Sequence, residues 1–543
     1  MTHGGHVPFA AALAVAGRLL QLSLYAQTPG NPPQPTTLRV TTHLVEVSVV
    51  AETKDGAPAP GLTADDFALY DQGRQEQIAV FSAPAQPASP GPQSGVPPDT
   101  FTNRVDRAIG PNITPTVILF DGLNTHIADQ AYARRQIVKF VEQLQPGERV
   151  ALYVLGRGPR ILQDFTDDPS TLLKALESFT GEYSPSLEEP LYDPAIPAPR
   201  HFQSWLGELS FNLIEHFDAD RAFRTARTIV SVAGHLERLP GRKNMIWVAG
   251  SFPVSFELDS LPAPRKTGRR PRTVSPEIDR AARALNNANV AVYPVDARGL
   301  MAPQEYRADR AEASQAIPGR DQAMFATMRV LAGRTGGRAF YNNNDLRAAM
   351  NRAMEDSRKS YTLGYYPSHD SWNGKFREIR VRVNRPGVEL HHRGGYFAQP
   401  DEPSEPWYRE QILDAATWSP LDATRLGLTV QVARLEDGTL ELDLLLDARD
   451  LSLVPKDGGW QCGLDLWLVQ LDSHEQHLTT KANTNNLRLN QTTYEQVLKS
   501  QGLRLLERLR PEPGAALLRV LVRDIASGAL GSVTIPLARL RPP

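Results

Sequence analysis

Strongly apolar segments that alternate with helical segments constrain the fold of the central part of this chain. The four apolar segments are TVILFDG (116–122), RVALYVLGR (149–157), NMIWVAGSF (244–252) and VAVYPVDAR (290–298). Segments with helical periodicity separate them. A strand that is apolar along its whole length is buried on both faces, and helical crossovers join parallel strands. The pattern therefore predicts an α/β fold with a doubly wound, mostly parallel sheet.

Segments of alternating polarity on both sides of this region predict β-structure. Residues 36–81 predict an N-terminal β module. Residues 82–110 are rich in Pro, Ser, Gln and Gly, and they predict a flexible linker because they offer little apolar surface to bury. We assign residues 111–400 to the central domain. Alternating runs after residue 425 predict a C-terminal β-sandwich domain, which we assign to residues 401–543.

The central domain is expected to contain two irregular insertions, at 180–217 and 253–275. Three alternating segments at its end, 360–368, 377–384 and 388–397, predict strands that extend or flank its sheet.

The N-terminus resembles a secretory signal. Residues Val7 to Leu24 are largely apolar and are followed by Tyr25-Ala26-Gln27, which predicts cleavage after Ala26. We therefore expect residues 1–26 to be a signal peptide and the protein to be secreted or periplasmic. The alternative is an N-terminal extension of a protein that is not exported. The apolar run is shorter than the roughly 20 residues that a membrane helix needs, so we expect no membrane span in the mature chain.

Charge and cysteine content exclude several classes of partner and site. Lys and Arg total 59 and Asp and Glu total 61, for a net charge of −2, so nothing in the overall charge favours a nucleic-acid partner. The single cysteine, Cys462, excludes an internal disulfide and a cysteine-cluster metal site. The basic run from Arg265 to Arg272 predicts a solvated loop in preference to an anion site.

Two segments of the sequence that approach catalytic motifs do not match them. His474-Glu475-Gln476-His477 lacks the spacing of a zinc-protease helix, and Gly250-Ser251-Phe252-Pro253 lacks the flanking glycines of a nucleophile elbow. We therefore predict that the protein is not an enzyme. The alternative is a hydrolase or other enzyme that uses carboxylates at the ends of strands, such as Asp121 and Asp296.

Several segments, taken in order, resemble the von Willebrand factor A-related proteins common in acidobacteria. The segments are VEVSVVAETKDG, LTADDFALYDQGRQEQIAVF, TVILFDGLNT, FTDDPSTLLKAL, LPGRKNMIWVAGSFP, NVAVYPVDARGL, LAGRTGGRAFYNNNDL and SYTLGYYPSHDSWNGKFREIRVRV. The resemblance covers roughly residues 36–400. It implies a von Willebrand A-like, Rossmann-type central domain between an N-terminal β module and a C-terminal β-sandwich.

The resemblance also implies where a metal site would lie. In this family an Asp-x-Ser-x-Ser loop, a distant Thr and a distant Asp hold Mg²⁺ or Mn²⁺. The corresponding loop runs from Asp121 to Thr125, with Leu123 in place of the first Ser and Asn124 between the ligand positions. Ser251 follows the strand that carries the distant Asp in the family. We therefore expect a degenerate site in which Asp121 and Thr125 are the residues that would hold Mg²⁺ or another divalent cation.

The resulting expectation is an exported binding protein that mediates protein–protein interaction or adhesion. We place contact with an unknown protein partner at the sheet edge that carries Asp121, Asn124, Thr125 and Ser251. A structural component of an envelope complex is the remaining alternative.

Overall fold

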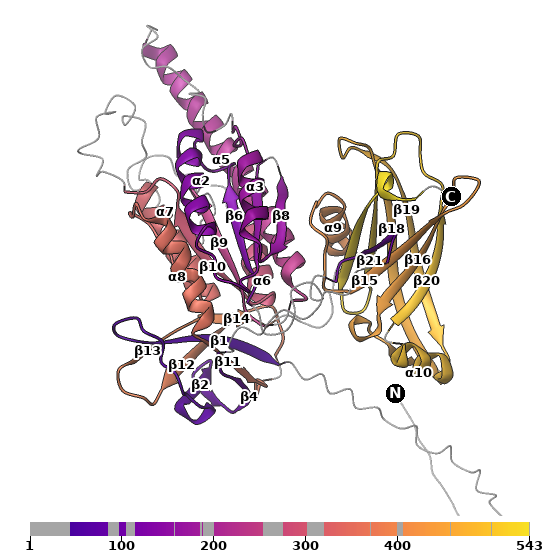
Figure 1. The fold of residues 1–543 in the computed structure, drawn as a ribbon, viewed down its shortest axis with the longest axis horizontal. Helices are drawn as coiled ribbons and strands as arrows, with labels where there is room; N and C mark the ends of the chain where they lie inside the picture. Colours follow the sequence, from indigo (N-terminus) through magenta and orange to yellow (C-terminus); the bar gives the residue numbers. More distant parts are fainter. Residues whose placement is uncertain are drawn as a thin grey trace, which may run out of the picture. The chain divides into compact units, whose positions relative to one another are not determined.

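The computed structural model shows an α/β region and several antiparallel sheets (Figure 1). The residues that it describes are 44–84, 97–104, 114–156, 158–184, 187, 200–239, 241–252, 275–300, 320–369, 371–398, 406–456, 458–500 and 502–541. The predicted signal peptide, residues 185–186 and 188–199 of the first predicted insertion and residues 253–274 of the second lie outside these residues. Residues 200–217, which the sequence assigned to the first irregular insertion, form part of a helix instead. None of the helices in this described part combines the length and apolar character that crossing a bilayer requires.

The central sheet has five strands in the order β10-β9-β6-β7-β8. They are β6 (Thr116–Asp121), β7 (Val150–Leu155), β8 (Pro159–Thr166), β9 (Lys243–Ala249) and β10 (Val290–Asp296). The first four strands of this order pair in parallel, whereas the edge strand β8 is antiparallel to β7. The expected mostly parallel sheet is thus confirmed in part, as one mixed sheet.

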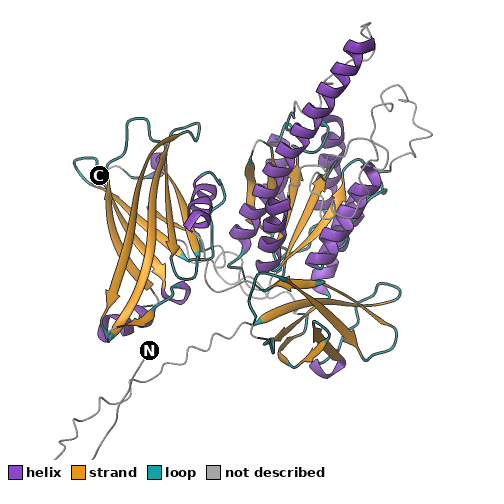
Figure 2. Ribbon diagram, turned by 180° about the vertical axis from the view of Figure 1, so that it is seen from behind, coloured by secondary structure: helices purple, strands orange, loops and turns teal. Residues whose placement is uncertain are grey.

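Helices cover both faces of this sheet (Figure 1, Figure 2). Ile118 and Phe120 of β6 face one helical layer, and Val117 and Leu119 face the other, because successive side chains of a strand point to opposite faces. The first layer contains α2 (Ile127–Val141), α3 (Pro169–Ser178) and α8 (Leu346–Arg358). The second contains α5 (Arg200–Leu236), α6 (Ser275–Asn287) and α7 (Arg320–Thr335).

A separate β unit forms from strands on both sides of the central region. Its two sheets have the orders β13-β1-β11-β4 and β14-β12-β2-β3. The strands from before the central region are β1 (Val45–Thr53), β2 (Phe67–Asp71), β3 (Arg74–Glu76) and β4 (Ile78–Ser82). Those from after it are β11 (Ser360–Tyr365), β12 (Phe376–Val383), β13 (Val388–His392) and β14 (Gly395–Phe397).

The structure therefore differs from the expectation that the strands between residues 360 and 397 extend or flank the central sheet. They pair with β1, β2 and β4 instead. The physical reason is their polarity. Alternate residues of β12 are exposed, whereas the inner strands of the central sheet are buried on both faces.

The C-terminal region contains two antiparallel sheets that share one hydrophobic core. The first has the order β20-β16-β15-β5, and in the second β18 lies between β19 on one side and β17 and β21 on the other, with β22 beyond β21. The strands are β15 (Leu428–Arg434), β16 (Leu440–Asp447), β17 (Val454–Lys456), β18 (Gly459–Leu471), β19 (His477–Leu489), β20 (Gly502–Leu509), β21 (Leu517–Asp524) and β22 (Leu530–Pro536). Two helices, α9 (Pro406–Thr417) and α10 (Gln491–Lys499), accompany them.

One strand of this region comes from the segment predicted as a linker. Residues 100–102 form β5 (Thr100–Thr102), which pairs with β15. The neighbouring Asn103 side chain secures the pairing. Its Nδ2 donates to the carbonyl oxygens of Ala423 and Leu426, and its Oδ1 accepts the N–H of Leu428.

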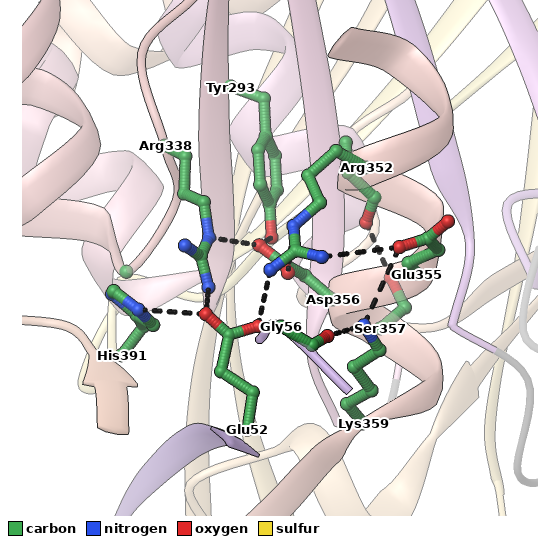
Figure 3. A network of polar contacts seen from close by, with 12 residues as sticks. Glu52, Gly56, Tyr293, Arg338, Arg352, Glu355, Asp356, Ser357, Lys359 and His391 are labelled. Carbon is green, nitrogen blue, oxygen red and sulfur yellow. Dashed lines mark hydrogen bonds and ion pairs between the residues drawn. The ribbon is translucent and has the colours of Figure 1, made fainter. Parts of the chain in front are cut away.

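A buried ionic network joins the β unit to the central region (Figure 3). Glu52 of β1 is 4% exposed and accepts hydrogen bonds from Arg338 (2.7 Å) and Arg352. Arg338 also donates to Asp356 of α8 at 2.9 Å. Burial alone would raise the pKa of Glu52, but the hydrogen bond and charge of Arg338 and the charge of Arg352 hold it below its usual value. His391 of β13 lies 3.1 Å from the same carboxylate.

We expect Glu52→Gln to lower the free energy of unfolding by about 3 kcal/mol, because removing one partner of a buried ion pair leaves the other charges uncompensated. Chemical denaturation measures this change. Glu378→Gln is the control, since Glu378 forms an exposed pair with Arg380 and such pairs contribute little. Equal stability of Glu52→Gln and the wild type would show that the network does not hold the β unit in place.

Candidate functional site

The carboxyl ends of four parallel strands meet at one edge of the central sheet, where doubly wound folds bind their ligands. β6 ends at Asp121 and leads through a short loop into α2. Gly156 follows β7, Gly250 and Ser251 follow β9, and Asp296 ends β10. This edge brings together the residues that the sequence assigned to partner and metal binding.

The carboxylate of Asp121 is buried, with no exposed surface, and N–H groups surround it. Oδ1 accepts the backbone N–H of Asn124 at 3.0 Å, and Oδ2 accepts the Asn124 side-chain amide at 2.8 Å. Oδ2 also accepts the indole N–H of Trp247 in β9 at 3.0 Å. Burial raises the pKa of Asp121 to about 6, and these donors offset part of that rise.

Asn124 and Thr125 connect this loop to neighbouring elements. The Thr125 hydroxyl donates to the carbonyl oxygen of Asp121 and accepts the N–H of Gly250 at 2.8 Å. Asn124 Nδ2 also donates to Thr225 of α5 at 2.9 Å. Gly250 permits this approach, because a Cβ there would lie 3.2 Å from the Cα of Thr125. The loop is thus tied to β9 and to α5.

These residues do not fit a metal ion. A cation at Asp121 would have to displace the N–H donors that both carboxylate oxygens accept, and the Thr125 hydroxyl already donates one hydrogen bond and accepts another. Asn124 Oδ1 is buried without a hydrogen-bond partner in the described part of the chain, but one neutral oxygen is too small a ligand set for a divalent cation. Leu123 is 8% exposed and belongs to the hydrophobic core. Within the described ranges, no group of three His, Cys, Asp or Glu residues is placed to hold a metal ion. The indole of Trp247 and the amide of Asn124 stabilise the carboxylate by hydrogen bonding instead.

Gln130 and Glu182 cover the loop, and the sequence analysis did not identify either residue. Gln130 of α2 donates to the carbonyl oxygens of Thr125 (2.7 Å) and Glu182 (2.8 Å) and accepts the N–H of Glu182 at 2.9 Å. The Glu182 carboxylate pairs with Arg160 at 2.6 Å. Its side chain packs against Gly122 with no room for a Cβ there. Glu182 therefore covers the loop and pairs with an arginine of β8.

The predicted partner-binding residues differ in how far their side chains are exposed. Asp121 and Thr125 are 0% exposed and Asn124 is 1% exposed, so a rigidly docked partner would not touch their side chains. Ser251 is partly exposed. The first three residues shape the edge from beneath its surface.

Three large apolar side chains are exposed at this edge. Ile127 at the start of α2 is 41% exposed, Tyr183 is 59% exposed and Leu300 is 64% exposed. We call these three residues the apolar rim. A protein partner that docks at this edge could bury these exposed aromatic and aliphatic side chains.

Contacts of α2 connect the members of the apolar rim. The Ile127 side chain lies against Gly181, two residues before Tyr183. On the other side of the helix, the Tyr132 hydroxyl donates to the carbonyl oxygen of Asn344. The Asn344 side chain in turn accepts the N–H of Leu300 at 2.7 Å. The rim thus follows the beginning of α2.

The second strand-end carboxylate, that of Asp296, is also engaged. It accepts the backbone N–H of Arg298 at 3.0 Å and two guanidinium hydrogen bonds from the same residue, at 3.0 and 2.9 Å. The side chain of Asp296 has no exposed surface. Neither Asp121 nor Asp296 therefore presents a free carboxylate to a substrate at this edge.

Comparisons with known proteins give only remote structural similarity. No protein-family model matches the chain, and no curated protein matches it. An aerotolerance-related membrane protein from Bacteroides fragilis is similar over 45% of this chain and 98% of its own, with 15% identity and a TM-score of 0.25. A von Willebrand factor type A protein from Catenulispora acidiphila is similar over 78% of this chain and 66% of its own, with 10% identity and a TM-score of 0.22. The pilus adhesin SpaC from Lactobacillus rhamnosus GG is similar over 77% of this chain and 54% of its own, with 8% identity and a TM-score of 0.23.

Protonation of Asp121 has a predictable effect on stability. The folded protein holds this proton to about pH 6, whereas the ordinary pKa is 3.8, so the folded state binds the proton more tightly. Its contribution to the free energy of unfolding therefore rises as the pH falls through 6 and levels off below the ordinary pKa. Relative to Asp121→Asn, we expect the wild type to gain about 2 kcal/mol between pH 7 and pH 4.5. Parallel pH dependences of the two proteins would contradict the raised pKa.

Divalent cations should not stabilise the protein. After treatment with a chelator, we expect Mg²⁺, Mn²⁺ and Ca²⁺ to leave the melting temperature unchanged. A cation at 100 times its dissociation constant would stabilise by about 2.7 kcal/mol, which thermal unfolding detects easily. A saturable shift that Asp121→Asn abolishes would show that the carboxylate binds a cation after all.

Proposed function

We propose that this protein is a non-enzymatic binding protein that engages a protein partner through the carboxyl edge of its central sheet. The observation that carries the proposal is the apolar rim of Ile127, Tyr183 and Leu300, three exposed apolar side chains around the beginning of α2 at this edge. The partner would cover these side chains and gain the hydrophobic free energy of their burial.

The buried loop beneath the rim supports this role. Hydrogen bonds of Asp121, Asn124 and Thr125 tie the loop to β9 and α5, and Gln130 fixes the backbone next to Tyr183. A surface that is already ordered loses little conformational entropy when it binds. The polar residues therefore act by positioning the rim, in contrast to the direct contact that the sequence predicts for them.

The carboxylates at the strand ends are already hydrogen-bonded within the protein, which favours a binding function over catalysis. A general acid or base must reach the proton that it transfers. Asp121 is buried under its hydrogen bonds, and Asp296 is occupied by Arg298. A hydrolase that uses these two groups is therefore the weaker proposal.

The relation to von Willebrand factor A-related proteins of the acidobacterial type is part of the same proposal. The strand order β10-β9-β6-β7-β8, with helices on both faces and Asp121 at the end of β6, supports a doubly wound domain of that kind. Export to the periplasm or the cell exterior rests on the apolar segment Val7 to Leu24 and its small-residue boundary at Ala26. We propose a metal-independent mode of binding for this chain, because Trp247 and Asn124 satisfy the carboxylate.

A photo-crosslinking amino acid at position 183 or 300 would test the proposed surface. In an extract of the envelope and secreted proteins of the source cells, we expect these two positions to crosslink the same partner. Position 506 is the control, because Leu506 of β20 is 63% exposed, which matches the 64% of Leu300.

Once the partner is identified, Tyr183→Ala and Leu300→Ala should each weaken its binding by about tenfold or more, as expected for central contacts of an interface. Leu506→Ala should leave the affinity unchanged. Adducts that form equally at position 506, or rim variants that bind as tightly as the wild type, would contradict the proposed surface.

A further inference from the structure

Two buried cations lie at the amino-terminal edge of the central sheet, at the opposite end of β9 from the candidate binding edge. Lys243 is the first residue of β9 and is 2% exposed. Arg393 lies between β13 and β14 of the β unit and is 8% exposed. Burying a charge costs free energy unless an opposite charge and hydrogen bonds compensate it. The partners of these two side chains are therefore informative.

Neither cation forms an ion pair with any residue that the structure describes. The Lys243 ammonium group donates to the carbonyl oxygen of Leu239 at 2.8 Å. The Arg393 guanidinium group donates to the carbonyl and side-chain oxygens of Asn286, at 3.0 and 3.1 Å, and to the carbonyl oxygen of Glu46. All of these acceptors are neutral, so both groups are buried without a bonded counter-ion.

The pKa of Lys243 reflects the missing counter-ion. Burial is the main reason that it falls from 10.5 to about 8, and the charge of Arg393 acts in the same direction. The carboxylates of Glu237 and Glu46 oppose this fall without restoring the usual value. Burial also lowers the pKa of Arg393. An anion next to the two groups would supply the negative charge that they lack.

Hydrogen-bond donors without acceptors lie in the same place. An ammonium group has three N–H donors, and Lys243 uses one of them among the described residues. Arg393 Nε and Asn289 Nδ2 are buried, and nothing in the described part of the chain accepts from either. The backbone of Asn289 contacts both neighbours. Its carbonyl oxygen accepts the N–H of Lys243 at 3.0 Å, and its N–H donates at 3.1 Å to the Asn286 carbonyl that Arg393 also binds.

We propose that Lys243, Arg393 and Asn289 form a binding site for a small inorganic anion, with chloride as the ligand. The unsatisfied groups are all donors, which is the pattern that an anion requires. A monoatomic anion is similar in size to a water molecule, so it suits a place that is buried this deeply.

The anion would join two parts of the fold. Lys243 and Asn289 belong to the central region and Arg393 to the β unit, so one bound ion accepts hydrogen bonds from both. It lies away from the apolar rim, and this inference does not depend on the proposed function.

Thermal unfolding of the full chain tests the site. The protein is prepared in sodium gluconate, which is then replaced stepwise by sodium chloride at constant ionic strength, so that general screening stays the same. We expect a saturable rise of the melting temperature by about 2 °C or more, because a ligand that binds the folded state stabilises it by mass action. Bromide should act like chloride.

Asn289→Asp places a carboxylate where chloride would bind. The φ angle of Asn289 is 51°, a conformation that Asp adopts nearly as readily as Asn. In gluconate this variant should melt at a higher temperature than the wild type, and chloride should then raise its melting temperature no further. Lys243→Met should also abolish the rise. Lys139→Met, which removes an exposed lysine from α2, should keep it.

A melting temperature that chloride leaves unchanged would overturn the proposal, since water would then satisfy the donors. A response of Asn289→Asp equal to that of the wild type would overturn it as well, and this result decides the matter even if Lys243→Met fails to fold. Loss of the response in Lys139→Met would show a general effect of salt on the surface, which also contradicts the site.

Discussion

The buried carboxylate of Asp121 needs hydrogen-bond donors, and this requirement organises the candidate binding edge. A buried charge that is neither paired nor hydrogen-bonded costs too much to persist. Here Asn124 and the indole of Trp247 supply the donors, from the loop after β6 and from β9. Because Asn124 also binds Thr225 of α5, one carboxylate couples two strands and a helix. The raised pKa of Asp121 reflects the free-energy cost of burying its charge.

Strand pairings and ion pairs between segments that are far apart in sequence stabilise the fold. The α/β region lies between two sets of strands that pair with each other, so the β unit is built from segments that are far apart in the chain. Glu52 with Arg338 and Arg352 joins that unit to α8 and its surroundings. β5 adds a further connection, since it belongs to the sheet of β15 but precedes β6 in the chain.

The sequence is most informative where periodicity decides the structure. Apolar runs such as 116–122 predict buried parallel strands, and β6 and its neighbours confirm them. Pairing partners of alternating strands are not encoded in their periodicity, so the association of β12 with β2 could not be predicted. Position in the family motif indicated Asp121 and Thr125. The roles of Trp247, Gln130 and Glu182 depend on contacts such as those of Trp247 with Asp121 and of Gln130 with Glu182, which join distant parts of the chain and for which one sequence contains no signal.

The nuclear magnetic resonance signal of the Trp247 indole N–H tests the central claim, which is that a hydrogen bond takes the place of a metal ion at Asp121. Trp247→Phe identifies this signal among the seven tryptophans of the chain. The hydrogen bond predicts slow exchange with water, a chemical shift that titrates near pH 6 and no response to Mg²⁺. A rapidly exchanging indole, or a shift that moves on saturation with Mg²⁺, would contradict the claim.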